Sequence, residues 1–298
     1  MEKNWGVIGH QNIVEFLQQS IKRERLAHAY LFYGLAGLGK AETAKKFAAE
    51  IIGHNIRLAT ELFELSPAED KKNITIEQVR EWRRSMSLKS FSKNYKVGII
   101  YEAEKLNRES ANALLKTLEE PAQRTVIIII ASDWSNLLQT IVSRSQQIKF
   151  LQVSQQDIKR ALKDKVADSR KLEEIISWAN GRPALAVRLA EDENYFNEIR
   201  ELKSLARKLI TSKLSERWEI LSREIDALKN SAEKVSRGFK LVEYLEADLR
   251  EELTESLSVA PADNRRLLKL LNLAGRSKID LWSNVQPRLV LENLLINL

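Results

Sequence analysis

Cysteine is absent from this chain of 298 residues, and histidine occurs only three times, at His10, His28 and His54. Without cysteine the chain has neither disulfides nor a cysteine-ligated zinc site. Three scattered histidines also disfavour a metal centre built on imidazole ligands. We therefore expect no metal site.

Long apolar runs are missing as well. No stretch approaches the ~20 apolar residues that cross a membrane, and the first residues lack the apolar segment of a signal peptide. We therefore expect a soluble cytoplasmic protein with no membrane partner. A hydrophobic content of 44% is typical of globular proteins and excludes a disordered chain.

The charge balance is modestly basic, with 48 Lys and Arg against 41 Asp and Glu, or +7. Such an excess is compatible with nucleic-acid binding, but an ordinary solvated surface produces it too. The charge alone leaves both interpretations open.

A glycine-rich loop at residues 34–41, Gly-Leu-Ala-Gly-Leu-Gly-Lys-Ala, is the most informative feature. In the pattern GxxxxGK[ST], backbone N–H groups surround the phosphates of a nucleotide while the lysine reaches the β- and γ-phosphates. The candidate nucleotide-binding residues are Gly34, Gly37, Gly39, Lys40 and Ala41. Ala41 lacks the hydroxyl that normally ligates Mg²⁺, and Thr43 lies roughly 200° further around the helix. An ordinary glycine-rich turn is the alternative.

Apolar strands alternate with helical segments in the first half of the chain. Residues 29–33, 96–101, 125–131 and 147–150 are predicted strands, and the run of four isoleucines suits a strand buried on both faces of a parallel sheet. Beyond Phe150 strand-like runs vanish and helical patterns remain. The sequence predicts an α/β P-loop domain at 1–153, a small helical lid at 154–198 and an all-α domain at 199–298.

Three further segments accompany the loop. A strand ends at Tyr101-Glu102, residues 107–121 read Asn-Arg-Glu-Ser-Ala-Asn-Ala-Leu-Leu-Lys-Thr-Leu-Glu-Glu-Pro, and Ser143-Arg144-Ser145 follows the isoleucine strand. With residues 28–32 and 284–295, they resemble the AAA+ clamp-loader subunits of bacterial DNA polymerase III, most closely the delta-prime family. The resemblance implies an AAA+ domain, a lid and a helical collar that joins a ring. It implies gamma/tau and delta clamp-loader subunits, the sliding clamp and primer-template DNA as partners.

The chain departs from active members of that family at several positions. Their strand ends in Asp-Glu, whereas Tyr101 stands here before Glu102, and the γ-phosphate sensor falls on Ala131. Glu102 matches the family's glutamate, so the resemblance adds Glu102 to the candidate residues of this degenerate nucleotide-binding site. The zinc-binding cysteines common in the family are missing, His54 alone cannot replace them, and the sequence does not show what residues 55–70 do instead. The comparison implies weak or absent ATP binding, no ATP cofactor and no ATP hydrolysis by this chain.

Arg144 is the candidate catalytic residue. In the family the arginine of Ser-Arg-Cys reaches the ATP site of the adjacent subunit, so the resemblance implies that Arg144 acts in trans as an arginine finger. A surface arginine in a loop is the alternative. Family helices also face DNA, and the candidate DNA contacts are Arg83, Arg84, Lys89 and Lys93, for which a solvated helix face is equally compatible.

Two rival functions remain at this point. One is an active clamp-loader ATPase of the gamma/tau type, which Ala41, Tyr101 and Ala131 disfavour. The other is a free-standing P-loop kinase or nucleotide-binding regulator, which the helical domains and the Ser-Arg-Ser context disfavour. Co-purification with clamp-loader subunits separates the second rival from the others.

Overall fold

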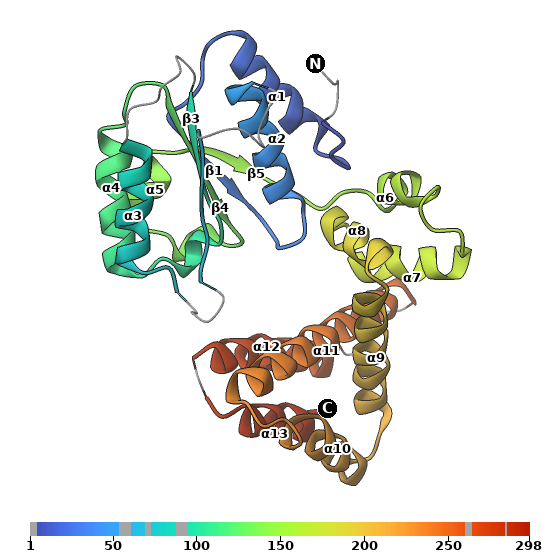
Figure 1. The fold of residues 1–298 in the computed structure, drawn as a ribbon. Helices are drawn as coiled ribbons and strands as arrows, with labels where there is room; N and C mark the ends of the chain where they lie inside the picture. The colour runs from blue at the N-terminus through green and yellow to red at the C-terminus, as the bar shows by residue number, and fades with distance from the viewer. Residues whose placement is uncertain (1–4, 54–60, 69–72, 88–94, 260–263, 284) are drawn as a thin grey trace. The chain divides into compact units, whose positions relative to one another are not determined.

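The computed structural model describes residues 5–53, 61–68, 73–87, 95–259, 264–283 and 285–298. The chain divides into two compact units, Met1–Glu191 and Asp192–Leu298. The first unit contains the sheet and the second is helical (Figure 1).

The first unit begins with strands and helices in alternation. Its strands are β1 (Ala29–Tyr33), β2 (Leu62–Leu65), β3 (Lys96–Ile100), β4 (Thr125–Ala131) and β5 (Gln146–Lys149). Its helices are α1 (Gln11–Lys22), α2 (Lys40–Ile52), α3 (Ile76–Ser87), η2 (Ala103–Lys105), α4 (Arg108–Glu119), η3 (Trp134–Asn136), α5 (Gln139–Ser143), α6 (Gln155–Leu162), α7 (Ser169–Ala179) and α8 (Pro183–Glu191).

The sheet has the strand order β2-β3-β4-β1-β5, and all of its pairings are parallel. Every residue of β4 is buried, and successive isoleucines enter the cores on opposite faces of the sheet. The predicted parallel sheet with a doubly buried isoleucine strand is therefore confirmed.

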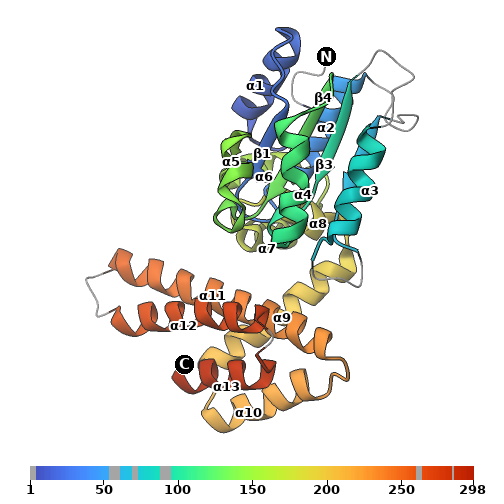
Figure 2. The same cartoon turned by 90° about the vertical axis from the view of Figure 1, so that its left-hand side faces the viewer.

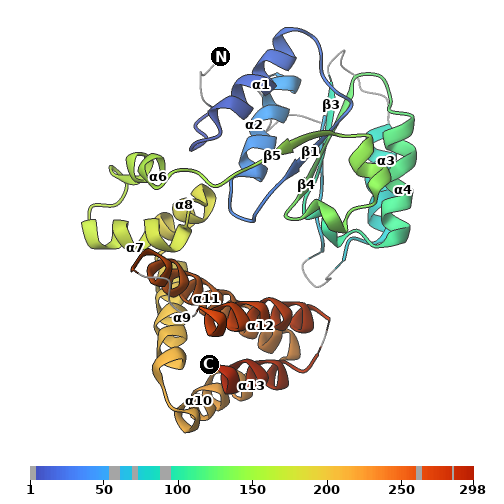
Figure 3. The same ribbon diagram turned by 180° about the vertical axis from the view of Figure 1, so that it is seen from behind.

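Helices cover both faces of the sheet. Helices α1 and α2 lie on one face, and α3, α4 and α5 lie on the other (Figures 1 and 3). The core under α3, α4 and α5 contains Trp82. Trp82 is buried, and its Nε1 donates to the carbonyl of Phe63 at 3.1 Å. A side chain at Gly98 would collide with the Trp82 ring, which explains the glycine in β3. Trp82 is thus a core residue, as its helical spacing with Val79 predicts.

The helical segment after β5 belongs to the first unit. Ser154 caps α6 by accepting a hydrogen bond from the Asp157 amide, and the Val153 amide donates to the carbonyl of Gly181 at 2.8 Å. Helix α9 (Glu193–Thr211) runs through the predicted boundary at 198/199, and the contacts divide the chain after Glu191.

The second unit is built from helices. After α9 it contains α10 (Leu214–Leu221), the π-helical turn η4 (Ser222–Asp226), α11 (Ser231–Val259), α12 (Arg265–Trp282) and α13 (Pro287–Asn297). Helices α11 and α12 lie side by side (Figure 2). The predicted all-α C-terminal region is therefore confirmed.

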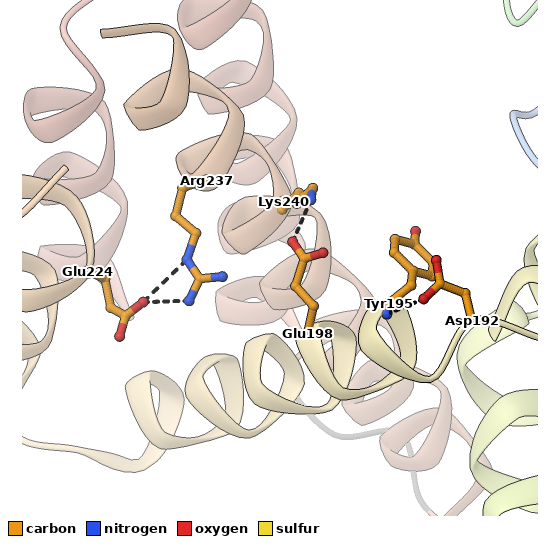
Figure 4. Close-up of polar contacts among 6 residues, drawn as sticks. All are labelled: Asp192, Tyr195, Glu198, Glu224, Arg237 and Lys240. Carbon is orange, nitrogen blue, oxygen red and sulfur yellow. Dashed lines mark hydrogen bonds and ion pairs between the residues drawn. The ribbon is translucent and has the colours of Figure 1, made fainter. Parts of the chain in front are cut away.

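Ion pairs connect α11 to α9 and to η4 in this unit (Figure 4). Lys240 lies 2.6 Å from Glu198 of α9, and Arg237 donates to Glu224 of η4 through Nη2 at 2.6 Å and Nε at 3.2 Å. Asp192 caps α9 by accepting from the Tyr195 amide at 2.9 Å. Polar contacts thus supplement the apolar core in fixing the register of α11 against α9 and η4.

Arg217 of α10 is a buried charged residue in this unit. It is only 9% exposed, and it donates to the carbonyls of Leu209 at 2.8 Å, Ile210 at 3.2 Å and Leu295 at 2.9 Å. These carbonyls belong to the last turns of α9 and α13, where helices leave acceptors without intrahelical partners. One guanidinium therefore joins the ends of two helices.

Candidate functional site

The glycine loop leads from the carboxyl end of β1 into α2, so the predicted strand, loop and helix are confirmed. Gly34, Gly37 and Gly39 have φ values of 136°, 82° and 89°, which L side chains rarely adopt. A Cβ at Gly34 would also collide with the carbonyl oxygen of Phe150. The three glycines are therefore required by the backbone path of the loop.

Lys40 is turned back onto the loop. Its side chain is buried, with 6% of the residue exposed, and Nζ donates to the carbonyl of Gly34 and to that of Leu35 at 2.6 Å. Burial lowers the pKa of Lys40 to about 8, and the charge of Glu104 acts in the opposite direction. The ammonium group thus has carbonyl partners within its own loop.

Helix α8 closes one side of the same loop. The Ala184 and Leu185 amides donate to the Gly37 carbonyl, at 2.9 Å and 3.4 Å. Arg182 donates through Nε to the carbonyl of Ala179 and through Nη2 to the carbonyl of Trp178, both at the end of α7. Arg182 thus caps the end of α7. The first amides of α8 fix the position of the loop.

The hydroxyl missing at Ala41 is not supplied by its neighbour. Ala41 is exposed in the first turn of α2, whereas Thr43 is fully buried and its hydroxyl donates to the Gly39 carbonyl at 2.9 Å. The helical spacing predicts this orientation of Thr43, and the structure confirms that its hydroxyl is bound to backbone.

Tyr101 occupies the position of the family's metal-organising aspartate. Its hydroxyl donates to a carboxylate oxygen of Glu64, and Lys45 lies 3.7 Å from that carboxylate and 5.8 Å above the tyrosine ring. Burial and the neighbouring Glu64 raise the pKa of Tyr101, so the phenol stays neutral. A neutral phenol that is already bonded to Glu64 cannot replace a carboxylate as a ligand of a metal ion.

Glu102 and Ala131 lie at the ends of adjacent strands. Glu102 has a left-handed φ of 49°, is 52% exposed and forms an ion pair with Lys105 at 2.5 Å. Ala131 is fully buried, and its register partner in β1 is Tyr33, the residue before the loop. The predicted sensor position thus lies on the strand next to β1, near the start of the loop, and carries only a buried methyl group.

Glu104 is a site residue that the sequence interpretation missed. Its Oε1 accepts from the Ser132 amide at 3.2 Å, and its Oε2 is buried with no hydrogen-bond partner among the described residues. Glu104 follows the carboxyl end of β3, the edge at which parallel sheets place ligand sites. A carboxylate at that edge was the signal available in the sequence.

Arg144 ends α5 and is 37% exposed. Its Nη2 lies 3.0 Å from Glu119 Oε1, and its Nη1 donates to the Thr140 carbonyl at 3.3 Å. Glu119 is the last residue of α4, so the segments Leu-Lys-Thr-Leu-Glu-Glu-Pro and Ser-Arg-Ser meet in space. The candidate finger is therefore oriented from within its own chain while part of its guanidinium remains at the surface.

A hollow of about 710 Å³ lies beside the loop in the same unit. Residues 6–13 line one side, and Arg160 and Asp157 of α6 line the other. His10 joins the hollow to the loop, because its Nε2 hydrogen-bonds the Leu38 carbonyl at 2.9 Å and its ring packs edge-on against Phe150. Burial lowers the pKa of His10, which favours the neutral ring.

The remaining predicted residues lie elsewhere. Arg83 is partly exposed and Arg84 is exposed near the end of α3, while Lys89, Lys93, His54 and residues 55–60 and 69–70 lie outside the described residues. Across the described part of the chain, no group of three or more His, Cys, Asp or Glu side chains is placed to hold a metal ion. Within that part, no helix has the length and apolar character to span a membrane.

The parallel sheet, the glycine loop after β1 and the helices that follow define a P-loop module of the AAA+ class with a helical C-terminal unit. The family model described as "DNA polymerase III, delta subunit" matches residues 9–154. The chain is also 33% identical over 221 residues to DNA polymerase III subunit delta-prime of Pseudomonas aeruginosa, across 66% of this chain and 67% of that protein. The chain belongs to the delta-prime family of DNA polymerase III clamp-loader subunits.

A tau subunit aligns over a smaller share of its own length. DNA polymerase III subunit tau of Bacillus subtilis is 29% identical over 184 residues, which cover 56% of this chain and 32% of that protein. Among solved structures, a gamma subunit-related protein of DNA polymerase III from Thermotoga maritima aligns with a TM-score of 0.56 and 21% identity, across 96% of this chain and 97% of that one. That structural likeness shows the fold alone.

Proposed function

We propose that this chain is a delta-prime-like subunit of the replicative clamp loader, which helps to load the sliding clamp onto primed DNA. It does not hydrolyse ATP itself, and it supplies Arg144 as an arginine finger to a neighbouring ATPase subunit. One observation carries the proposal: Ala41, Tyr101 and Ala131 stand at the positions where active members of the family have polar groups for metal and γ-phosphate, while Arg144 is present and partly exposed.

The chemistry of phosphoryl transfer supports the first half. Hydrolysis depends on a metal that bridges the β- and γ-phosphates and on polar groups that position the nucleophile. The Tyr101 phenol is bound to Glu64, and Lys40 donates to the carbonyls of its own loop. The proposal therefore includes no ATP cofactor for this subunit.

The family of the chain supports the proposed partners. Its relatives include delta-prime, tau and gamma subunits of DNA polymerase III, so we propose gamma/tau and delta subunits as ring neighbours. Contacts with the sliding clamp and primer-template DNA follow from the same assembly, with Arg83 and Arg84 as described candidates for phosphate contacts.

An active ATPase of the gamma/tau type is the second candidate. The glycines of the loop, Lys40 and Glu102 are all present, and the hollow beside His10 lies next to the loop. Ala41 and Tyr101 weigh against this candidate because both metal-organising groups are missing.

Purified chain should show no magnesium-dependent cleavage of ATP in single-turnover assays. A Lys40→Ala preparation is the control, since cleavage that survives in it comes from a contaminant. The chain should also co-purify with gamma/tau and delta subunits. Cleavage that disappears in Lys40→Ala would contradict the proposal, and failure to join those subunits would favour a free-standing nucleotide-binding protein.

A further inference from the structure

We propose that Glu104 is a built-in counter-anion of the phosphate-binding loop and that its carboxylate excludes nucleotide phosphates from Lys40. The inference deepens the proposed function, because it rests on a subunit that does not use ATP. It explains the absence of nucleotide binding by a residue that is present, Glu104, in addition to the hydroxyl missing at Ala41 and the carboxylate missing at Tyr101.

The hydrogen bond to Ser132 fixes the position of this carboxylate. Ser132 follows Ala131, whose register partner Tyr33 immediately precedes Gly34. The Glu104 carboxylate is therefore held at the strand ends beside the first residue of the loop. The carbonyl of that same Gly34 accepts a hydrogen bond from Lys40.

The second carboxylate oxygen indicates which positive charge Glu104 stabilises. Glu104 Oε2 is buried and has no hydrogen-bond partner among the described residues, and a buried charge is tolerated when an opposite charge lies nearby. Lys40 is that charge: it is buried as well, and the charge of Glu104 raises its pKa against the lowering by burial. The charge of Glu104 thus stabilises the charged form of Lys40.

The phosphates of a nucleotide would have to compete with Glu104 for the positive charge of Lys40. The phosphates held by such a loop lie at the lysine and the first amides of the helix, so they would enter the field of a fixed carboxylate. Like charges repel strongly where water is scarce. Removing the charge of Glu104 should therefore tighten the binding of phosphate ligands to the loop, even without the metal-organising groups.

Glu104→Gln tests this with little change in shape, because the amide oxygen can still accept from Ser132. We expect isothermal titration of the full chain with pyrophosphate and with ADP to show binding at least ~10-fold tighter in Glu104→Gln than in the unmodified chain. Glu109→Gln, at an exposed position in the first turn of α4, is the matched control and should leave the affinity unchanged.

A second readout does not depend on ligand binding. The rate at which an amine-specific acylating reagent modifies Lys40, followed against pH by peptide mass spectrometry, should give a lower pKa for Lys40 in Glu104→Gln. Glu104→Ala, which leaves no polar group in the buried position, should shift both readouts in the same direction and covers the case in which Glu104→Gln fails to fold.

Equal affinities in the unmodified chain and both variants, or an unchanged pKa of Lys40, would overturn the inference and leave the proposed function intact. Tight binding and cleavage of ATP by the unmodified chain would instead overturn the proposed function.

Discussion

In a reconstituted clamp loader, Arg144→Ala is expected to lower ATP turnover at the site that this subunit completes by ~10³-fold or more. The guanidinium would neutralise charge on the transferring phosphoryl group of the neighbouring subunit, and an alanine leaves that charge without a partner. Single-turnover hydrolysis with limiting ATP measures the effect, and clamp loading on primed DNA should fall with it.

The same substitution should leave the fold unchanged. Arg144 is 37% exposed and Glu119 47%, and ion pairs at such exposure contribute at most ~1 kcal/mol to stability. Thermal unfolding of Arg144→Ala should therefore match the unmodified chain, and Arg108→Ala, at an exposed position on α4, is the control for loss of a positive charge. Turnover that stays the same in Arg144→Ala would refute the trans role.

Arg217→Ala is expected to lower the free energy of unfolding of the helical unit by ~3 kcal/mol or more. It removes three charge-assisted hydrogen bonds at once and leaves the carbonyls of Leu209, Ile210 and Leu295 without that donor. Urea denaturation of the full chain, followed by circular dichroism, measures the change. Weaker co-purification with the other subunits should follow because this unit is the proposed ring contact.

Two companion variants separate this effect from a simple loss of charge. Arg217→Lys should recover only part of the stability, because an ammonium group lacks the planar fork that reaches several acceptors. Arg223→Ala, at an exposed position of η4, should change stability by less than ~0.5 kcal/mol. An Arg217→Ala chain as stable as Arg223→Ala would show that the three hydrogen bonds do not hold the helix ends together.

The parts of the fold that could be predicted have local physical causes. The isoleucine strand lacks polar alternation because β4 lies between β3 and β1 and is covered on both faces. Gly34 and Gly39 indicate the loop because their backbone conformations exclude most other residues. The helical spacing of Trp82 with Val79 and Met86 predicts its place in the core, where all three residues are buried.

The rest of the site depends on contacts between distant segments. Tyr101 meets Glu64, Glu104 meets Ser132, and Arg144 meets Glu119 only through the register and crossing of the strands and helices that carry them. Helical periodicity carries no information of that kind.

The sequence predicts a boundary at 198/199, whereas the division between the two units falls after Glu191. A single residue, Asp192, separates α8 from α9, so the helical pattern continues almost without interruption across it. Its capping bond to the Tyr195 amide is the local mark of a new helix, but a cap does not show that a new unit begins.

We propose that the catalytic contribution of this chain comes from Arg144 and not from its own loop. Steady-state ATP hydrolysis by reconstituted complexes that carry either Lys40→Ala or Arg144→Ala in this subunit tests it most directly. We expect the Lys40→Ala complex to retain the rate of the unmodified complex and the Arg144→Ala complex to lose the turnover of one site. A rate that falls with Lys40→Ala and stays constant with Arg144→Ala would contradict it.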